Sequence, residues 1–270
     1  MKFEIPYNFN YDDKYFEYLH TIDKSYIDNI YLPIYSNIGK FTNTRENLIQ
    51  FPSSKEEYDK HISLFKEENI PLSFLIQRFS NRGLIEEYMN ISNRFIINND
   101  TLARELKEYY KENIILTLSI TRNLTFEEIL NTDLSMYDYI CLSFYFPHHL
   151  QLIEKLPDKY KYLIICNSKC LTNCKHPENH WFEINTEFSK ICNHLKFINM
   201  NINMKNSSFI RPEDIELFNP YISIFKLEGR ELPSNDIFKD LNAYINKKST
   251  NKLLSNFNYS NIKSNYCQKI

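Results

Sequence analysis

Residues 94–120, RFIINNDTLARELKEYYKENIILTLSI, decide the fold of this chain. The stretch begins with an apolar run, Arg94–Asn98, and ends with a second one, Asn113–Ile120. Between them lies a helical segment, Thr101–Tyr110, and Asn99 precedes it as an expected N-cap. Continuous apolar runs are typical of parallel strands that helices cover on the outside. The stretch therefore predicts a strand, a helix and a second, parallel strand.

The same pattern recurs along the chain. Strands are predicted at Phe3–Tyr7, Tyr26–Tyr35, Pro71–Gln77, Arg94–Asn98, Asn113–Ile120, Tyr137–Phe144, Tyr162–Cys166 and Tyr221–Leu227. Helices are predicted at Tyr11–Leu19, Lys55–Glu68, Leu84–Met89, Thr101–Tyr110, His149–Leu156, Arg211–Phe218 and Asp236–Lys247, and Thr125 begins a capping-box pattern.

Eight strands in 270 residues predict a single α/β domain, a (β/α)8 TIM-type barrel over residues 1–248. A doubly wound open sheet is the alternative, but the chain has neither a Gly-x-Gly-x-x-Gly turn nor a P-loop. The remaining residues, 249–270, form a polar tail that we expect to be poorly ordered.

Composition narrows the class of protein. The net charge of -2 gives no bulk attraction to nucleic acid or to an anionic membrane. No stretch reaches the roughly 18 apolar residues of a membrane span, and the start of the chain lacks a signal-peptide pattern. We therefore expect a cytoplasmic protein, in which the 6 cysteines are thiols or metal ligands rather than disulfides.

A cysteine-rich loop is inserted after the seventh predicted strand. Cys166, Cys170 and Cys174 are spaced four residues apart, and Cys192 follows. Closely spaced thiolates in a reducing compartment indicate either zinc or an iron–sulfur cluster. We predict Cys170, Cys174 and Cys192 as ligands, with Cys166, His180 or a substrate atom as the fourth. Thiols without any metal are the third possibility.

Polar side chains gather at the carboxyl ends of the predicted strands, where (β/α)8 barrels place their active sites. Several of them are cationic, which suits an anionic carboxylate or phosphate group. The residues predicted to bind substrate at these ends are Arg78, Asn98, Arg122, Asn167, Lys226 and Arg230. We expect the cysteine loop to cover the mouth of the barrel, which is the end where the strands have their carboxyl ends.

Three motifs together resemble a known superfamily. They are residues 167–174 with His180, residues 209–215 (FIRPEDI) and residues 225–230 (FKLEGR). They resemble motifs of the collagenase-like U-type peptidases, specifically the iron–sulfur branch similar to prephenate-dependent RNA hydroxylases and the ubiquinone hydroxylase pair. The resemblance implies a (β/α)8 barrel and, in several members, a four-cysteine iron–sulfur cluster. The chain lacks the longer peptidase signature of the family, with its Gly-rich cysteine segment, and this absence argues against proteolysis.

The function that follows is an iron–sulfur enzyme, with a 4Fe-4S cluster, that modifies or hydroxylates an anionic small molecule, nucleoside or peptide. His180 and Glu213 are the predicted proton-transfer residues, and Arg211 joins the substrate-binding residues. A thiol- or zinc-dependent peptidase or hydrolase is one alternative. The other is a non-catalytic cluster-binding subunit, because the ubiquinone pair forms a heteromer; a hetero- or homo-oligomer is therefore expected.

Overall fold

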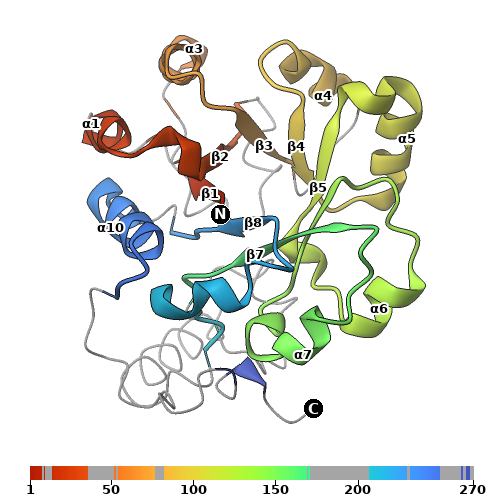
Figure 1. Cartoon of the computed structure of the whole chain (residues 1–270). Helices are drawn as coiled ribbons and strands as arrows, with labels where there is room; N and C mark the ends of the chain where they lie inside the picture. The colour runs from red at the N-terminus through yellow and green to blue at the C-terminus, as the bar shows by residue number, and fades with distance from the viewer. Residues whose placement is uncertain are drawn as a thin grey trace, which may run out of the picture.

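The computed structural model describes residues 1–7, 9, 14–35, 52, 54–76, 82–168, 170, 207–229, 232–249, 263, 266 and 267. Its strands form a closed barrel in chain order, and every neighbouring pair of strands is parallel (Figure 1). The barrel closes where β1 pairs with β8, with Phe3 opposite Phe225 and Glu4 opposite Lys226. The predicted (β/α)8 barrel is confirmed.

The strands are short, as is usual for a parallel barrel. Their bounds are β1 Phe3–Pro6, β2 Ile27–Pro33, β3 Leu72–Ile76, β4 Arg94–Ile97, β5 Ile115–Leu118, β6 Tyr139–Cys141, β7 Lys161–Ile165 and β8 Ile224–Lys226. The α-helices are α1 Lys14–Thr21, α3 Lys55–Glu67, α4 Arg82–Met89, α5 Asp100–Tyr110, α6 Phe126–Asn131, α7 Leu150–Ile153 and α10 Ser234–Ile245. The 3-10 helices are η1 Lys24–Tyr26, η3 Lys111–Asn113, η4 Ile120–Arg122, η5 Phe146–His148 and η7 Pro212–Leu217.

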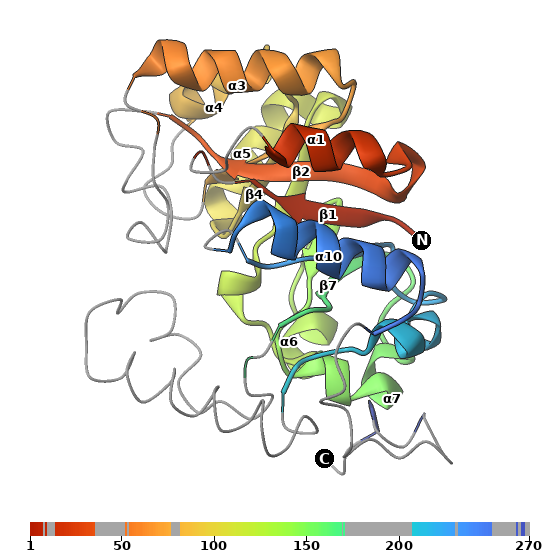
Figure 2. The ribbon, with the colours of Figure 1, turned by 90° about the vertical axis from the view of Figure 1, so that its left-hand side faces the viewer.

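The helices form a layer around the barrel (Figure 1). The first and last of them, α1 and α10, lie side by side in both views of the ribbon (Figures 1 and 2). Tyr15 of α1 packs edge-on against Phe238 of α10, with ring centroids 4.9 Å apart. The helical layer is therefore closed at the same place as the strand barrel.

Alternation along each strand separates two apolar regions. On β1, Phe3 and Ile5 belong to the main core between strands and helices. Glu4, between them, is on the opposite face of the strand and lies inside the barrel. The barrel interior holds two smaller apolar clusters, one of Tyr31, Leu75 and Ile96 and one of Ile120, Cys141, Phe144, Leu163, Ile165, Cys170 and Ile224. Because the side chains of these clusters fill the interior, the barrel is a packed core rather than a channel.

Helix starts follow the local signals in the sequence. The Asn99 side chain accepts a hydrogen bond from the Leu102 N–H (3.0 Å), which caps α5 as expected. Thr125 and Glu128 form the predicted capping box at the start of α6. These contacts satisfy backbone N–H groups that have no partner within a first helical turn.

Two segments differ from the sequence-based expectation. The predicted helix at residues 211–218 is the 3-10 helix η7, and α7 has only 4 residues. In the tail, the described residue Tyr266 is fully buried. Its ring packs edge-on against Phe218, with centroids 5.2 Å apart, so this part of the tail is docked on the barrel.

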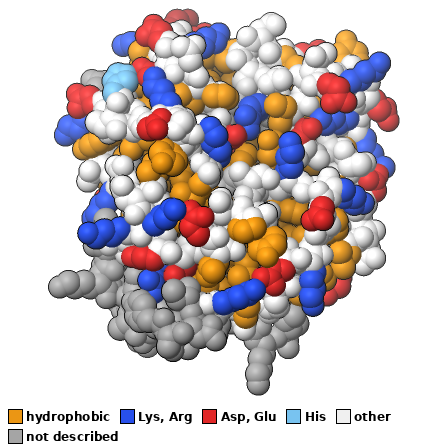
Figure 3. Space-filling model, in the orientation of Figure 1, with side chains coloured by type: hydrophobic (Ala, Val, Ile, Leu, Met, Phe, Trp, Pro, Cys, Tyr) orange, Lys and Arg blue, Asp and Glu red, His pale blue; other side chains and the backbone are white. Residues whose placement is uncertain are grey.

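The surface carries mixed charge. On the face shown in Figure 3, Lys and Arg side chains are interspersed with Asp and Glu side chains. Within the described part of the chain, no helix has the length and apolarity that crossing a membrane requires. The mixed charge agrees with the small net charge of the sequence.

Candidate active site

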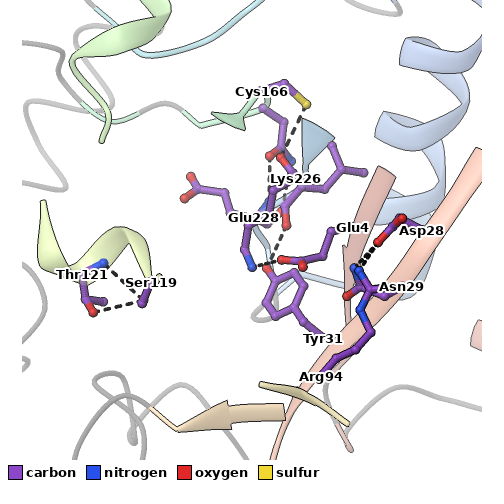
Figure 4. Close-up of polar contacts among 12 residues, drawn as sticks. Glu4, Asp28, Asn29, Tyr31, Arg94, Ser119, Thr121, Cys166, Lys226 and Glu228 are labelled. Carbon is purple, nitrogen blue, oxygen red and sulfur yellow. Dashed lines mark hydrogen bonds and ion pairs between the residues drawn. The ribbon is translucent and has the colours of Figure 1, made fainter. Parts of the chain in front are cut away.

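A buried ion pair joins the first and last strands inside the barrel. The Lys226 ammonium is paired with the Glu4 carboxylate, and the two residues are 6% and 1% exposed. The Lys226 Nζ atom also lies 3.6 Å from the centroid of the Tyr31 ring (Figure 4). The Tyr31 hydroxyl donates to the Leu227 carbonyl (2.7 Å), which fixes the ring beneath the ammonium.

This pairing changes what Lys226 offers to a ligand. We predicted it as a cation for an anionic substrate, and it does lie at the carboxyl end of β8. Its charge is already balanced by Glu4, and breaking such a pair without a replacement is costly. Lys226 therefore serves first to hold the barrel closed.

Asn167, directly after β7, ties three elements together. Its Nδ2 donates to the Glu228 carbonyl and to Asp240 Oδ2 of α10, both at 3.0 Å. Its Oδ1 accepts from the Glu228 N–H at 2.8 Å. The amide is buried, and both its nitrogen and its oxygen make hydrogen bonds. Asn167, which we predicted to bind substrate, therefore acts in this structure as a clamp between β7, β8 and α10.

The clamp fixes the backbone of Glu228, which follows β8. Glu228 itself is half-buried, and Figure 4 shows its carboxylate pointing away from the Glu4–Lys226 pair, toward the side on which Ser119 and Thr121 lie. Gly229 then turns the chain with a φ of 125°, and a Cβ at this position would lie 2.8 Å from Leu232 Cδ1. Only glycine fits this turn without strain.

A small network of hydroxyl and amide groups follows β4 and β5. Asn98 Nδ2 donates to Thr121 Oγ1 (3.1 Å), and that hydroxyl donates to Ser119 Oγ (3.0 Å). Ser119 and Thr121 are buried, and Asn98 is half-buried. The predicted residue Asn98 therefore belongs to a neutral hydrogen-bonding group at the strand ends.

Arg122, also predicted to bind substrate, is exposed beside Asp100. Its Nη2 lies 3.6 Å from Asp100 Oδ2, and the Tyr137 hydroxyl donates to the other oxygen of that carboxylate (2.8 Å). The pair is partly open to solvent, so the attraction between the charges is modest. Like Lys226, Arg122 was predicted to bind an anionic substrate and has a carboxylate beside it.

The described cysteines lie in different surroundings. Cys166 belongs to the core between barrel and helices, where burial raises the pKa of its thiol well above the ordinary 9.0. Cys170 and Cys141 belong to an apolar cluster inside the barrel. Burial raises the pKa of Cys141 to about 12, which makes it an inert core thiol. Cys166 and Cys170 therefore do not face a common point, and Cys166 does not fit as a ligand beside Cys170.

The two ends of the cysteine-rich segment are joined at the barrel mouth. The Ser208 N–H donates to the Cys170 carbonyl (2.7 Å), and the Ile210 N–H donates to the Cys166 carbonyl (2.9 Å). The Tyr244 hydroxyl of α10 contacts the carbonyls of both Cys166 (2.8 Å) and Ile210 (2.7 Å). The segment thus leaves and re-enters the fold beside the carboxyl end of β7.

Arg211 and Glu213 lie on the return from this segment, on η7 and its N-cap. Arg211 is buried with its Nε 3.3 Å from Asp214 Oδ2, and the Tyr266 hydroxyl donates to the same oxygen (2.6 Å). Glu213 Oε1 accepts from the Ser249 N–H (2.6 Å) beyond the end of α10. Both predicted site residues therefore have structural partners in the outer layer of the fold.

Five predicted site residues lie outside the described residues: Arg78, Cys174, His180, Cys192 and Arg230. Within the described ranges, no group of three His, Cys, Asp or Glu side chains is arranged to hold a metal ion. A groove of ≈ 920 Å³ lies on the outer side of α10, lined in part by Tyr18, Phe238 and Asn242.

Sequence reasoning missed Glu4, Tyr31 and Tyr266. Glu4 had a usable signal, since it is the one charged residue of the strand FEIP and must face away from Phe3 and Ile5. Its partner lies at the far end of the chain, so only barrel closure reveals the pair. Tyr266 carried no signal within the polar tail.

Comparisons with known proteins agree with this architecture. The chain is 30% identical over 118 residues to "Uncharacterized protease MJ1657" of Methanocaldococcus jannaschii; the match covers 39% of this chain and 36% of that relative. Among solved structures, the U32 peptidase Mk0906 matches with a TM-score of 0.54 at 12% identity, covering 86% of this chain and 95% of that one. No family model matches the sequence.

Proposed function

We propose that this chain is an enzyme that acts at the mouth of its barrel, at the carboxyl ends of the strands. The premise is a relationship to the collagenase-like U32 peptidase superfamily, which both relatives support. We further propose that the cysteine-rich segment binds an iron–sulfur cluster there and that the enzyme modifies a peptide-like or other anionic substrate. A reducing compartment would keep the cysteine ligands of such a cluster from forming disulfides.

The observation that carries the proposal is the position of Cys170. Its side chain belongs to the apolar cluster inside the barrel, and its carbonyl accepts hydrogen bonds from both the N–H and the hydroxyl of Ser208. The first predicted ligand is therefore held at the strand ends. Apolar surroundings and backbone hydrogen bonds tune the potential of protein-bound iron–sulfur clusters.

The proposed ligand set differs from the simple cysteine spacing. Cys170, Cys174 and Cys192 all remain predictions from the sequence. Because Cys166 lies in the outer core, we assign the fourth position to His180 or to a substrate atom. When bound, the cluster would supply electron transfer or Lewis-acid chemistry at the mouth.

The chain's own residues supply the remaining features of an active site. Asn98, Ser119 and Thr121 offer neutral hydrogen-bond partners, and the inner apolar cluster excludes water from the floor of the mouth. Low local polarity strengthens every electrostatic contact made there. An anionic group of the substrate would depend on the predicted residues Arg78 and Arg230, since Lys226 and Arg122 have carboxylates beside them.

Anaerobic purification tests the cluster. We expect a brown protein with broad absorbance near about 400 nm, which thiolate-bound iron–sulfur clusters show. Cys170→Ala should remove this absorbance and the bound iron and sulfide. Cys141→Ala, which empties a neighbouring position of the same apolar cluster, should retain both. A colourless wild-type protein without iron would refute the cluster.

A peptidase is the second candidate, and the descriptions of the two relatives favour it. Zinc content and release of peptides from denatured collagen or casein distinguish the two candidates. A colourless protein with one zinc per chain and chelator-sensitive hydrolysis would support the peptidase. A cluster without activity in the isolated chain, restored by a co-purified subunit, would instead support the predicted partner role.

A further inference from the structure

Glu228 differs from the other charged residues at the strand ends of the described barrel. Lys226 is paired with Glu4, and Arg122 lies beside Asp100. The carboxylate of Glu228 has no hydrogen-bond or ion-pair partner among the described residues. One negative charge therefore remains available at the mouth.

The backbone of Glu228 is held more firmly than a surface glutamate requires. One buried amide, that of Asn167, bonds both its N–H (2.8 Å) and its carbonyl (3.0 Å). The same amide is anchored to Asp240 on α10, and Gly229 allows the chain to turn away immediately afterwards. The Cα–Cβ direction of Glu228 is thus fixed by three elements.

Glu228 lies two residues beyond the carboxyl end of β8. Figure 4 shows the Glu228 carboxylate projecting toward the side of Ser119 and Thr121, whose hydroxyl groups are hydrogen-bonded to each other (3.0 Å). Functional groups held on rigid strand ends and supported by surrounding hydrogen bonds are typical of recognition and catalytic sites. Because the backbone is already ordered, binding at Glu228 restricts only the torsions of the side chain.

We propose that Glu228 is the recognition residue for a protonated amine of the substrate. This inference rests on the proposed location of the active site, and it narrows the substrate to an amino-bearing, peptide-like molecule. An ammonium group offers three donors, and a carboxylate accepts from them in charge-assisted hydrogen bonds. A divalent metal ion is a poorer occupant, because the described residues around Glu228 do not supply the further carboxylate or imidazole ligands it needs.

Binding of simple peptides to the anaerobically purified full chain tests this assignment. The probes are trialanine with a free amino terminus and the same peptide acetylated at that terminus, compared by calorimetry or ligand-observed NMR. We expect the free peptide to bind and the acetylated peptide to bind at least about tenfold more weakly, because acetylation removes the charge. Binding of the free peptide should also weaken as salt is raised.

Variants separate Glu228 from general electrostatics. Glu228→Gln should lower affinity for the free peptide at least about tenfold and leave affinity for the acetylated peptide unchanged. Glu105→Gln, the same change at an exposed position on α5, should bind both peptides as the wild type does. Circular dichroism and the unfolding midpoint confirm that each variant folds.

Three outcomes would overturn the assignment: equal binding by Glu228→Gln, equal binding of the two peptides, or no binding of free trialanine by the wild type up to about 10 mM. The absorbance near about 400 nm, recorded on the same samples, reports separately on the cluster. Amine binding without a cluster would refute the proposed cofactor and retain Glu228. A cluster without amine selectivity would do the reverse.

Discussion

Replacing Lys226 by methionine should destabilise the barrel at its seam. Methionine keeps much of the length of the lysine stem but removes the ammonium, which leaves the Glu4 carboxylate 1% exposed and without its partner. Loss of one partner of a buried ion pair costs about 3–5 kcal/mol. Since a domain is typically stable by about 5–15 kcal/mol, the variant should lose a fifth or more of its stability.

Urea unfolding followed by circular dichroism measures this loss as a lower midpoint with an unchanged slope. A double variant, Glu4→Leu with Lys226→Met, removes both charges and should recover most of the deficit, because the neutral pair no longer carries an uncompensated charge. Lys55→Met breaks an exposed i,i+4 pair with Asp59 and should cost no more than about 0.5 kcal/mol.

The reasoning fails if Lys226→Met costs less than about 1 kcal/mol, which is the range of exposed pairs. It also fails if the double variant is no more stable than Lys226→Met alone. In either case the buried pair would be incidental to barrel closure.

Three further predictions concern other buried polar groups. Asn167→Ala should cost about 2–3 kcal/mol, measured by urea unfolding, because it leaves the clamped backbone groups without partners. Tyr266→Phe should cost about 1.5–3 kcal/mol in the same assay, because the Tyr266 hydroxyl bridges the Arg211 N–H (3.2 Å) and Asp214 (2.6 Å). A change below about 0.5 kcal/mol would show that the contact of Tyr266 with the barrel is dispensable. Burial lowers the pKa of His149 from 6.5 to about 4, so the unfolded chain binds the extra proton first and stability should fall as pH drops from about 6.5 to about 4. His149→Gln should flatten this pH dependence, and an unchanged profile would contradict it.

The fold was predictable because its signals are local and repeated. Apolar runs and caps such as Asn99 and Thr125 depend on neighbouring residues, and they locate strands and helix starts in the structure. The short form of η7 was less predictable. Pro212 is compatible with any helical first turn, so the local sequence does not distinguish a 3-10 helix from an α-helix, and the packing of η7 against α10 is visible only in the structure.

The site was only partly predictable, because residue type does not reveal a partner. Asn98 and Lys226 lie at the strand ends as expected. Both side chains have partners that are distant in the chain. Glu4, the partner of Lys226, lies 222 positions from it. The cysteine spacing suggested a common ligand set that the placement of Cys166 does not support. The sequence did not distinguish Glu228 from other polar residues that follow strands, because its hydrogen bonds to Asn167 depend on the fold.

Closure of the barrel also bears on how the chain folds during synthesis. β1 is made early, but one of its two neighbours, β8, emerges from the ribosome only with residues 224–226. Until then β1 presents an open strand edge, which is a template for aberrant pairing. Glu4 points a charge inward along that edge, and an inward charge is one of the features that discourage sheet-to-sheet aggregation. The same carboxylate that completes the finished barrel therefore protects the unfinished one, and Lys226 ends that role when it arrives.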